Sequence, residues 1–308
     1  MIVLNAEPNG YSEKAIESWK QKGYTYKASA WNEIDNSNSF NDVNILIVRL
    51  ARKVDSKVLD KFPSLTHLFS ATTGLDHIET GALKERNIKL VSLRGHDDFL
   101  KTIPSTAEHT WALLLALIRN IPAANEDVKR GNWNRDEFRG YQLKEKKIGI
   151  IGLGRTGKKI ASYAQAFDMQ LQYFDPYVNE QSFHKCNSLE ELLSSSDIIS
   201  IHVHLNEETH QLIGKHNIGL IKKDSLLINT SRGNILDEIA VAEALQSKKI
   251  KGVATDVLST ELADIKLSPF WQAQQQKENI IITPHIGGAT CDAMWACEEY
   301  LVQQNFAD

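Results

Sequence analysis

The stretch KKIGIIGLGRTG, residues 146–157, decides the fold of the larger part of this 308-residue chain. The β-rich run Lys147–Ile151 leads into Gly152-Leu-Gly154-Arg-Thr-Gly157, and a helical pattern follows over Lys158–Phe167. In this context the first glycine permits a tight turn, the second lets a pyrophosphate approach the backbone, and the third lets helix and strand pack closely. The sequence therefore predicts a dinucleotide-binding loop at a helix N-terminus. The alternative is a glycine-rich turn that binds no ligand.

An acidic residue at the end of the next predicted strand indicates which dinucleotide is bound. Asp175 closes the run QLQYFD, 175 − 152 = 23 residues after Gly152. A carboxylate in that place accepts hydrogen bonds from the ribose hydroxyls and repels a 2′-phosphate. No arginine lies near Asp175 in the sequence to bind such a phosphate, so NAD is favoured over NADP. The alternative is a turn aspartate ahead of Pro176.

Composition excludes several other classes of protein. Charged residues are 24% and hydrophobic residues 42% of the chain, as in globular proteins, and the net charge of −4 argues against a nucleic-acid binder. The three cysteines, Cys186, Cys291 and Cys297, form no C-x-x-C pair, which argues against a disulfide scaffold or a cysteine-rich zinc site. We therefore expect no metal, and reduced thiols in the cytoplasm.

Neither the N-terminus nor the longest apolar run of the chain predicts a membrane segment. The N-terminus has neither the basic nor the apolar region of a signal peptide. The longest apolar run, Trp111–Ile118, is far shorter than the roughly 18 residues that span a bilayer. We therefore expect no membrane partner, and a buried helix over this run.

Strand and helix patterns alternate along the chain in two series, which predicts two α/β domains. The long helix Pro104–Ile121 separates the series, and the polar stretch QAQQQKEN, residues 272–279, is expected to be a loop. In the first series strands are expected at residues 2–5, 24–28, 45–49, 65–70 and 88–92, and helices at 12–22, 55–62 and 77–86. In the second series strands are expected at residues 147–151, 170–175, 198–203, 225–230, 252–257 and 280–285, and helices at 158–167, from 188, and at 237–248.

Three late strands each end on a residue that can take part in catalysis. Arg232 follows one strand, Asp256 and Glu261 follow the next, and His285 follows the last. Ligands of open α/β sheets bind at the carboxyl ends of the strands, so these side chains should gather at one edge. Arginine binds a carboxylate, histidine moves a proton near neutral pH, and a carboxylate orients the imidazole. Taken singly, each could instead be a surface, loop or core residue.

These motifs together resemble the D-isomer-specific 2-hydroxyacid dehydrogenases, of the D-3-phosphoglycerate dehydrogenase-like group. The resemblance covers most of the chain, in order ATTGLDHIE (71–79), STAEHTWALLLAL (105–117), KKIGIIGLGRTG (146–157), YFDPY (173–177), HVHLNEETHQLI (202–213), NTSRGNILDE (229–238), TDV with Glu261 (255–261) and TPHIGGAT (283–290). It implies that Arg232, Glu261 and His285 are the catalytic residues.

The resemblance also predicts which residues bind the substrate and the cofactor. Substrate binding falls to Arg49, Thr73 and Gly74. Cofactor binding falls to Thr106, Gly152, Gly154, Arg155, Thr156, Gly157, Asp175, His202, Val203, Thr209, Thr230, Ser231, Asp256 and Gly288. The chain departs from the family pattern at His204 and Leu262 in place of prolines, Asp168 in place of a glycine, and Leu50 in place of a smaller or polar residue.

The implied architecture is two doubly wound parallel-sheet α/β domains. A Rossmann-type NAD-binding domain, residues 100–285, is inserted in a flavodoxin-like substrate-binding domain, residues 1–99 plus 286–308. The implied reaction is reversible hydride transfer between C2 of a D-2-hydroxy acid and NAD. His285 would exchange the proton, Glu261 would stabilise the imidazolium, and Arg232 would bind the carboxylate and polarise the C2 oxygen.

Two further matters stay open. An NAD-sensing corepressor or partner-binding protein on the same fold is the alternative function, because fold does not fix function. A formate dehydrogenase-like activity is disfavoured, since such enzymes carry an amide where this chain has Glu261. The sequence does not identify the substrate. Five neighbouring residues could bind a phosphorylated or dicarboxylate acid, or could form a solvated face: Arg49, Arg52, Lys53, Arg94 and His96. The apolar segment Ser105–Ile121 predicts a buried seam, and the family resemblance implies a homodimer.

Overall fold

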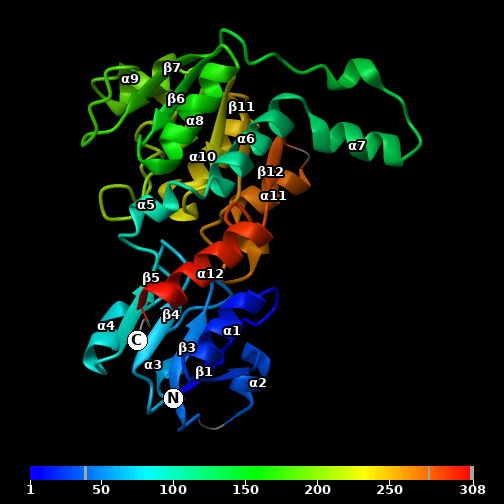
Figure 1. The fold of residues 1–308 in the computed structure, drawn as a ribbon. Coiled ribbons are helices and arrows are strands. Elements are labelled where there is room, and N and C mark those ends of the chain that lie inside the picture. Colours follow the sequence, from blue (N-terminus) through cyan, green and yellow to red (C-terminus); the bar gives the residue numbers. More distant parts are fainter. Residues whose placement is uncertain (38–39, 277, 306–308) are drawn as a thin grey trace. The chain divides into compact units, whose positions relative to one another are not determined.

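A computed structural model describes residues 1–37, 40–276 and 278–305 (Figure 1). The chain divides into two compact units, Met1–Ile103 with Ala289–Asp308 (unit 1) and Pro104–Gly288 (unit 2). These boundaries lie three or four residues from the expected ones, 99/100 and 285/286. The first shift has a physical reason, because Phe99 stacks on Tyr300 with ring centroids 3.9 Å apart and thereby ties residues 97–100 to unit 1.

Unit 1 is built on a five-stranded sheet in the order β2-β1-β3-β4-β5, with every pair parallel. This is the flavodoxin-like order, which confirms the expected fold class. The strands are β1 (Ile2–Asn5), β2 (Thr25–Ala28), β3 (Val43–Val48), β4 (His67–Ser70) and β5 (Lys89–Ser92). The helices are α1 (Glu13–Gln21), α2 (Trp31–Asp35), α3 (Ser56–Leu59), α4 (Thr80–Glu85), α5 (Asp97–Leu100) and α12 (Cys291–Asn305).

Helices cover both faces of this sheet, so its strands are apolar rather than alternating. Ile45 and Ile47 of β3 pack with α1, α5 and α12, around the fully buried Trp19. Leu46 and Val48 face the other way, into a core shared with α2, α3 and α4. The sequence analysis missed α2, a short helix with no side-chain cap.

Unit 2 is built on a seven-stranded parallel sheet in the order β12-β11-β10-β9-β6-β7-β8. The order reverses beside β6, as in Rossmann folds, and the edge there is where such folds bind nucleotides. The strands are β6 (Lys147–Ile151), β7 (Gln170–Phe174), β8 (His184–Lys185), β9 (Ile198–Ile201), β10 (Ser225–Asn229), β11 (Ile250–Thr255) and β12 (Ile280–Ile282). The helices of four or more residues are α6 (Ser105–Ile118), α7 (Ile121–Lys129), η1 (Arg135–Phe138), α8 (Arg155–Ala166), α9 (Leu189–Ser195), α10 (Glu238–Gln246) and α11 (Pro269–Gln275).

The apolar side chains of α6 pack largely inside unit 2. Leu113, Leu114 and Leu117 lie in the core on the α8 face of the sheet, together with Trp111 and Ile118. The other face is covered by α9, α10 and α11. The expected burial of α6 is therefore accounted for by its own unit.

Residues 119–141 form an arm that runs from the end of α6, through α7 and η1, and back to the sheet (Figure 1). None of the α7 side chains is buried. Large apolar side chains of the arm are exposed, among them Trp133 at 85% and Ile121 at 52%. Near the start of the arm, Asn120 adopts a left-handed φ of 54°, which ends α6.

The expectation of a loop over residues 272–279 was wrong for its first half. Residues 272–275 belong to α11, while residue 277 lies outside the described residues. Ser268 caps this helix by accepting a hydrogen bond from the Phe270 amide, and Pro269 occupies its first turn. This start signal outweighs the polar glutamine composition.

Candidate active site

The glycine loop joins β6 to α8 with the geometry that the sequence predicts. Gly152 has a φ of +86°, a region that favours glycine. A Cβ on Gly157 would collide with the carbonyl oxygen of Gly152, so helix and strand approach as closely as they do only with glycine there. Gly154 is exposed, and a Cβ added to it would meet no atom within 4 Å outside its two chain neighbours and its own helix. The open backbone at the N-terminus of the 12-residue α8 therefore fits a dinucleotide pyrophosphate.

Asp175 lies at the carboxyl end of β7 and is only 9% exposed. One carboxylate oxygen, Oδ2, accepts a hydrogen bond of 2.8 Å from the Leu153 amide in the glycine loop. The other, Oδ1, accepts from the amides of Tyr177 and Val178 at 2.9 and 3.1 Å. Asp175 therefore both caps a turn and contacts the glycine loop. Its carboxylate oxygens still have lone pairs that can accept hydrogen bonds from ribose hydroxyls.

His202 follows β9 and faces the same loop. Its amide donates to the Ile151 carbonyl at 2.7 Å, and its Nε2 lies 2.7 Å from the Ser200 hydroxyl. Burial lowers the pKa of His202 to about 3. The ring is therefore neutral at physiological pH and adds no charge to the predicted cofactor site.

Arg232 follows β10 in an extended conformation and is partly exposed. Its Nη1 donates a 2.7 Å hydrogen bond to the Ser231 carbonyl, and the Asn229 side chain donates to the Arg232 carbonyl at 2.9 Å. A Cβ on the neighbouring Gly233 would collide with the backbone of Leu258 and Ser259. This close approach joins the Arg232 segment to the segment that leads to Glu261.

His285 and Glu261 form a direct pair. His285 Nδ1 lies 3.0 Å from Glu261 Oε2, and the side chains are 22% and 27% exposed. His285 has a φ of 55°, a left-handed conformation that is uncommon outside glycine and that often occurs at functional sites. Because Nδ1 faces the carboxylate, Nε2 is the nitrogen left to exchange a proton with another molecule.

Asp256 holds the turn that carries His285. Its side chain is 2% exposed and accepts hydrogen bonds from the Thr283 hydroxyl at 2.6 Å and from the Ile286 and Gly287 amides at 2.9 and 2.7 Å. The His285 amide donates to the Asp256 carbonyl at 2.8 Å. A carboxylate so engaged orients the histidine turn, a role that the sequence analysis did not assign to it.

Two residues of this network were missed from the sequence. His109 Nε2 on α6 lies 3.0 Å from the Thr283 hydroxyl and 3.2 Å from Asp256 Oδ1. Glu238, which is 5% exposed, accepts from the Ser259 amide and the Ser268 hydroxyl, both at 2.6 Å, and so holds both ends of the Glu261 segment. Both His109 and Glu238 lie inside quoted motifs, but only the fold shows their partners.

In unit 1, Arg49 is held by protein groups. Its Nε and Nη2 donate to Glu298 Oε1, and its Nη1 donates to the Asn9 carbonyl at 2.8 Å. Burial raises the pKa of Glu298, while Arg49 acts in the opposite direction and favours the carboxylate. The predicted substrate arginine therefore ties β3 to α12, and any substrate would share its guanidinium with Glu298.

The other predicted substrate residues, Thr73 and Gly74, lie in the half-buried loop after β4. Within the described ranges their amides donate no hydrogen bond, and the Thr72 hydroxyl donates to the Gly74 carbonyl at 3.0 Å. These amides are available to an anion. Among the neighbouring cations, Arg52 pairs with Asp35 at 2.8 Å and His96 lies 3.1 Å from the Tyr300 hydroxyl.

The structure thus places the predicted catalytic and cofactor residues in unit 2, at the ends of β6, β7, β9, β10, β11 and β12 and at the start of α6. The substrate residues lie in unit 1. Glu261 and His285 are in direct contact, and Arg232 lies on the adjoining segment. Among the described residues, no helix combines the length and apolar character that a bilayer crossing requires.

The fold and this edge of the sheet define a dinucleotide-binding α/β protein with a histidine–glutamate pair. Residues 111–287 match the family described as "D-isomer specific 2-hydroxyacid dehydrogenase, NAD binding domain". The chain belongs to this family, and unit 2 contains its NAD-binding domain.

Named relatives agree with this assignment. The chain is 33% identical to a D-3-phosphoglycerate dehydrogenase of Methanocaldococcus jannaschii, over 95% of this chain and 55% of the relative. It is 34% identical to a glyoxylate reductase of Thermococcus litoralis, over 86% of this chain and 80% of the relative. The structure of an Aquifex aeolicus D-lactate dehydrogenase complexed with NAD and lactic acid is similar, with a TM-score of 0.80, 27% identity, and 98% and 93% of the two chains covered. The chain spans about half the length of the first of these relatives.

Proposed function

We propose that the protein is an NAD-dependent oxidoreductase that interconverts a D-2-hydroxy acid and its 2-oxo acid. The observation that carries the proposal is the 3.0 Å contact between His285 and Glu261, in the same unit as the glycine loop. NAD, when bound, accepts or donates the hydride at C2. The protein's residues then have to bind the acid, orient it and move one proton.

His285 is the proton-transfer residue of this proposal. Glu261 holds the Nδ1 side of the ring and favours the imidazolium, so Nε2 donates a proton to the C2 oxygen in reduction and removes it in oxidation. Asp256 and Glu238 hold, by hydrogen bonds, the two segments that carry His285 and Glu261. These bonds keep the two side chains in the orientation that proton transfer requires. Arg232 binds the carboxylate and stabilises negative charge on the C2 oxygen.

The substrate class rests on the relatives and on unit 1. The relatives act, by their names, on 3-phosphoglycerate, glyoxylate or lactate, which are all small 2-hydroxy or 2-oxo acids. The unengaged amides of Thr73 and Gly74 are suited to a carboxylate. Since Arg49 and Arg52 already pair with acidic residues, a phosphorylated substrate has no preformed cluster of unpaired arginines to bind in that segment.

The decisive test is an assay of 2-oxo acids with NADH, including glyoxylate, pyruvate and 3-phosphohydroxypyruvate. We expect oxidation of NADH with at least one of them. Binding of NADH without turnover of any acid would instead favour the NAD-sensing, partner-binding alternative. Failure to bind NADH would overturn both.

The same assay tests the choice of cofactor. A carboxylate at Asp175 should repel the 2′-phosphate of NADPH, so kcat/KM should favour NADH by at least about tenfold, or about 1.4 kcal/mol. The Asp175→Ala variant should narrow this preference. Equal turnover with NADPH in the parent enzyme would contradict the proposed role of the carboxylate.

Cys186 and Cys291 are free thiols, which favours a cytoplasmic location.

We also propose that the protein is a homodimer, joined through the arm at residues 119–141. The arm exposes Ile121, Val128, Trp133 and Tyr141, each at about half or more of its surface, and a second copy of the chain would cover them. Sedimentation at micromolar concentration should give a dimer of the 34.7 kDa chain, and Trp133→Ser combined with Val128→Asp should shift it to the monomer. A monomeric parent protein would refute this proposal.

A further inference from the structure

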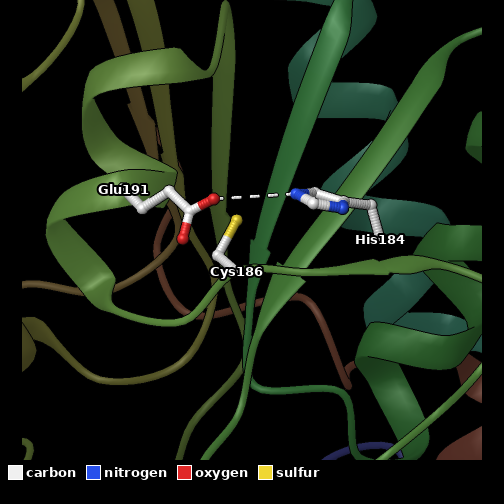
Figure 2. A group of neighbouring side chains, drawn as sticks. All are labelled: His184, Cys186 and Glu191. Atoms are coloured by element: carbon white, nitrogen blue, oxygen red, sulfur yellow. Dashed lines mark ion pairs between the residues drawn. The ribbon is translucent and has the colours of Figure 1, made fainter.

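Three side chains with different donor atoms meet at the β8 edge of the unit 2 sheet (Figure 2). The opposite edge of this sheet is β12, the strand that precedes His285. His184 belongs to the edge strand β8, Cys186 follows it, and Glu191 lies in α9. A donor atom from each lies within 4.8 Å of the other two, and His184 Nε2 is 3.7 Å from Glu191 Oε1. Figure 2 shows the three side chains pointing toward one another.

The donors are those that zinc uses in proteins: an imidazole nitrogen, a thiolate sulfur and a carboxylate oxygen. In a tetrahedral site such donors are about 3.3–3.6 Å apart, as bond lengths of about 2.0–2.3 Å require. The cluster therefore has to contract by about 1 Å, which rotation of the 64% exposed His184 side chain can supply. One thiolate and one carboxylate would also balance the charge of a divalent cation.

Glu191 is already oriented for such a role. Its Oε2 accepts hydrogen bonds from the amide and side chain of Asn187 at 2.7 and 3.2 Å, and its own amide donates to the Ser188 hydroxyl. This capping arrangement occupies one carboxylate oxygen and leaves Oε1 facing His184. Hydrogen bonds that orient a ligand in this way are typical of metal sites.

The strand geometry places the other two donors. His184 and Cys186 are two residues apart in extended backbone, so their side chains lie on the same face, and the Cys186 amide donates to the Tyr173 carbonyl at 2.8 Å. Cys186 is buried, which raises the pKa of its thiol to about 11, and a bound cation has to displace that proton. The Cys186 thiol is the buried ligand of this group, and the exposed His184 side chain lies on the solvent side.

We propose that His184, Cys186 and Glu191 bind a divalent transition-metal cation such as Zn²⁺, with water as the fourth ligand. The site would be structural. β8 pairs with β7 through only two residue pairs, so a cation shared with α9 would fasten a weakly paired edge strand. This inference is independent of the proposed oxidoreductase activity.

Cobalt titration of the metal-free 308-residue chain tests the proposal. Co²⁺ should bind one to one, with visible bands of a tetrahedral site and a near-ultraviolet thiolate charge-transfer band, and Zn²⁺ should displace it. His184→Gln and Glu191→Gln should each weaken binding by at least about tenfold, and Cys186→Ser should abolish the charge-transfer band. Glutamine at residue 191 keeps the capping interaction, so that variant tests ligation rather than folding.

Cys291→Ser is the matched control, because it removes an exposed thiol elsewhere in the chain. It should leave the Co²⁺ spectrum and affinity unchanged. The thermal unfolding midpoint of the parent should rise with Zn²⁺, and that of Glu191→Gln should not. A parent protein without a charge-transfer band, or a band that survives in Cys186→Ser and is lost in Cys291→Ser, would overturn the proposed site.

Discussion

Replacement of His202 by glutamine should reduce the acid sensitivity of folding. Burial lowers the pKa of His202 to about 3 in the folded protein, against about 6.5 for an exposed histidine. Between these values the unfolded chain binds a proton that the folded protein excludes. The contribution of His202 to stability is therefore complete above about pH 6.5 and decreases as the pH falls toward 3.

The expected change in the free energy of unfolding follows from the difference between the folded-state and unfolded-state pKa values of His202. Between about pH 7.5 and pH 5, the two pKa values give a loss of about 2 kcal/mol in the free energy of unfolding. Any folded-state pKa below about 4 gives nearly the same figure, because the folded protein is then unprotonated throughout this range. Other groups also titrate here, so the informative quantity is the difference between the parent and the variant.

Urea unfolding at these two pH values, followed by circular dichroism and fluorescence, measures that difference. Glutamine can still form a hydrogen bond with Ser200, which lies 2.7 Å from the ring in the parent. His202→Gln should lose about 2 kcal/mol less than the parent on acidification. His210→Gln, which replaces an exposed histidine in the following segment, should behave as the parent does. An equal loss in His202→Gln and the parent would refute the inferred burial of a neutral ring.

Three other substitutions test the site and the fold. His285→Ala should lower kcat for reduction by about 10²–10⁴-fold and leave the NADH dissociation constant nearly unchanged, and a fully active variant would overturn the assignment of the site. Glu261→Gln should lower kcat for reduction, because the His285 ring loses the charged partner that orients it; an unchanged kcat would remove Glu261 from the mechanism. Asp168→Gly should raise the free energy of unfolding by about 0.5–1 kcal/mol in urea, because Asp168 ends α8 with a left-handed φ of 54°, whereas Asp168→Ala should not.

The parts of the fold that depend on local signals could be predicted from the sequence. The glycine loop lies between a strand and a helix with strong patterns, and each glycine has a steric reason to be there. The gathering of Arg232, Glu261 and His285 followed from the rule that parallel strands present their carboxyl ends at one edge. The family resemblance marks Asp168 as a departure from glycine, and the structure gives Asp168 a backbone conformation that glycine prefers.

What the sequence could not show depends on partners far apart in the chain. Arg49 and Glu298 are 249 residues apart, and nothing in the local pattern around Arg49 shows that its guanidinium is engaged. His109 and Thr283 are 174 residues apart, so the support of the histidine turn was equally hidden. The α7 arm buries none of its side chains, and a helix without a core-facing stripe gives a weak periodic signal.

The bond between the Asp175 carboxylate and the Leu153 amide limits how cofactor preference can be redesigned. The carboxylate that is proposed to repel a 2′-phosphate also joins the glycine loop to the end of β7, so one side chain would set both the cofactor selectivity and the order of the loop. A variant with a small neutral residue at 175 would tolerate NADPH at the expense of the order of its pyrophosphate loop. Efficient conversion to NADPH therefore needs at least two changes, one that supplies a cation for the phosphate and one that gives the Leu153 amide a new acceptor. Directed evolution that selects single substitutions would meet an intermediate that binds both nucleotides weakly.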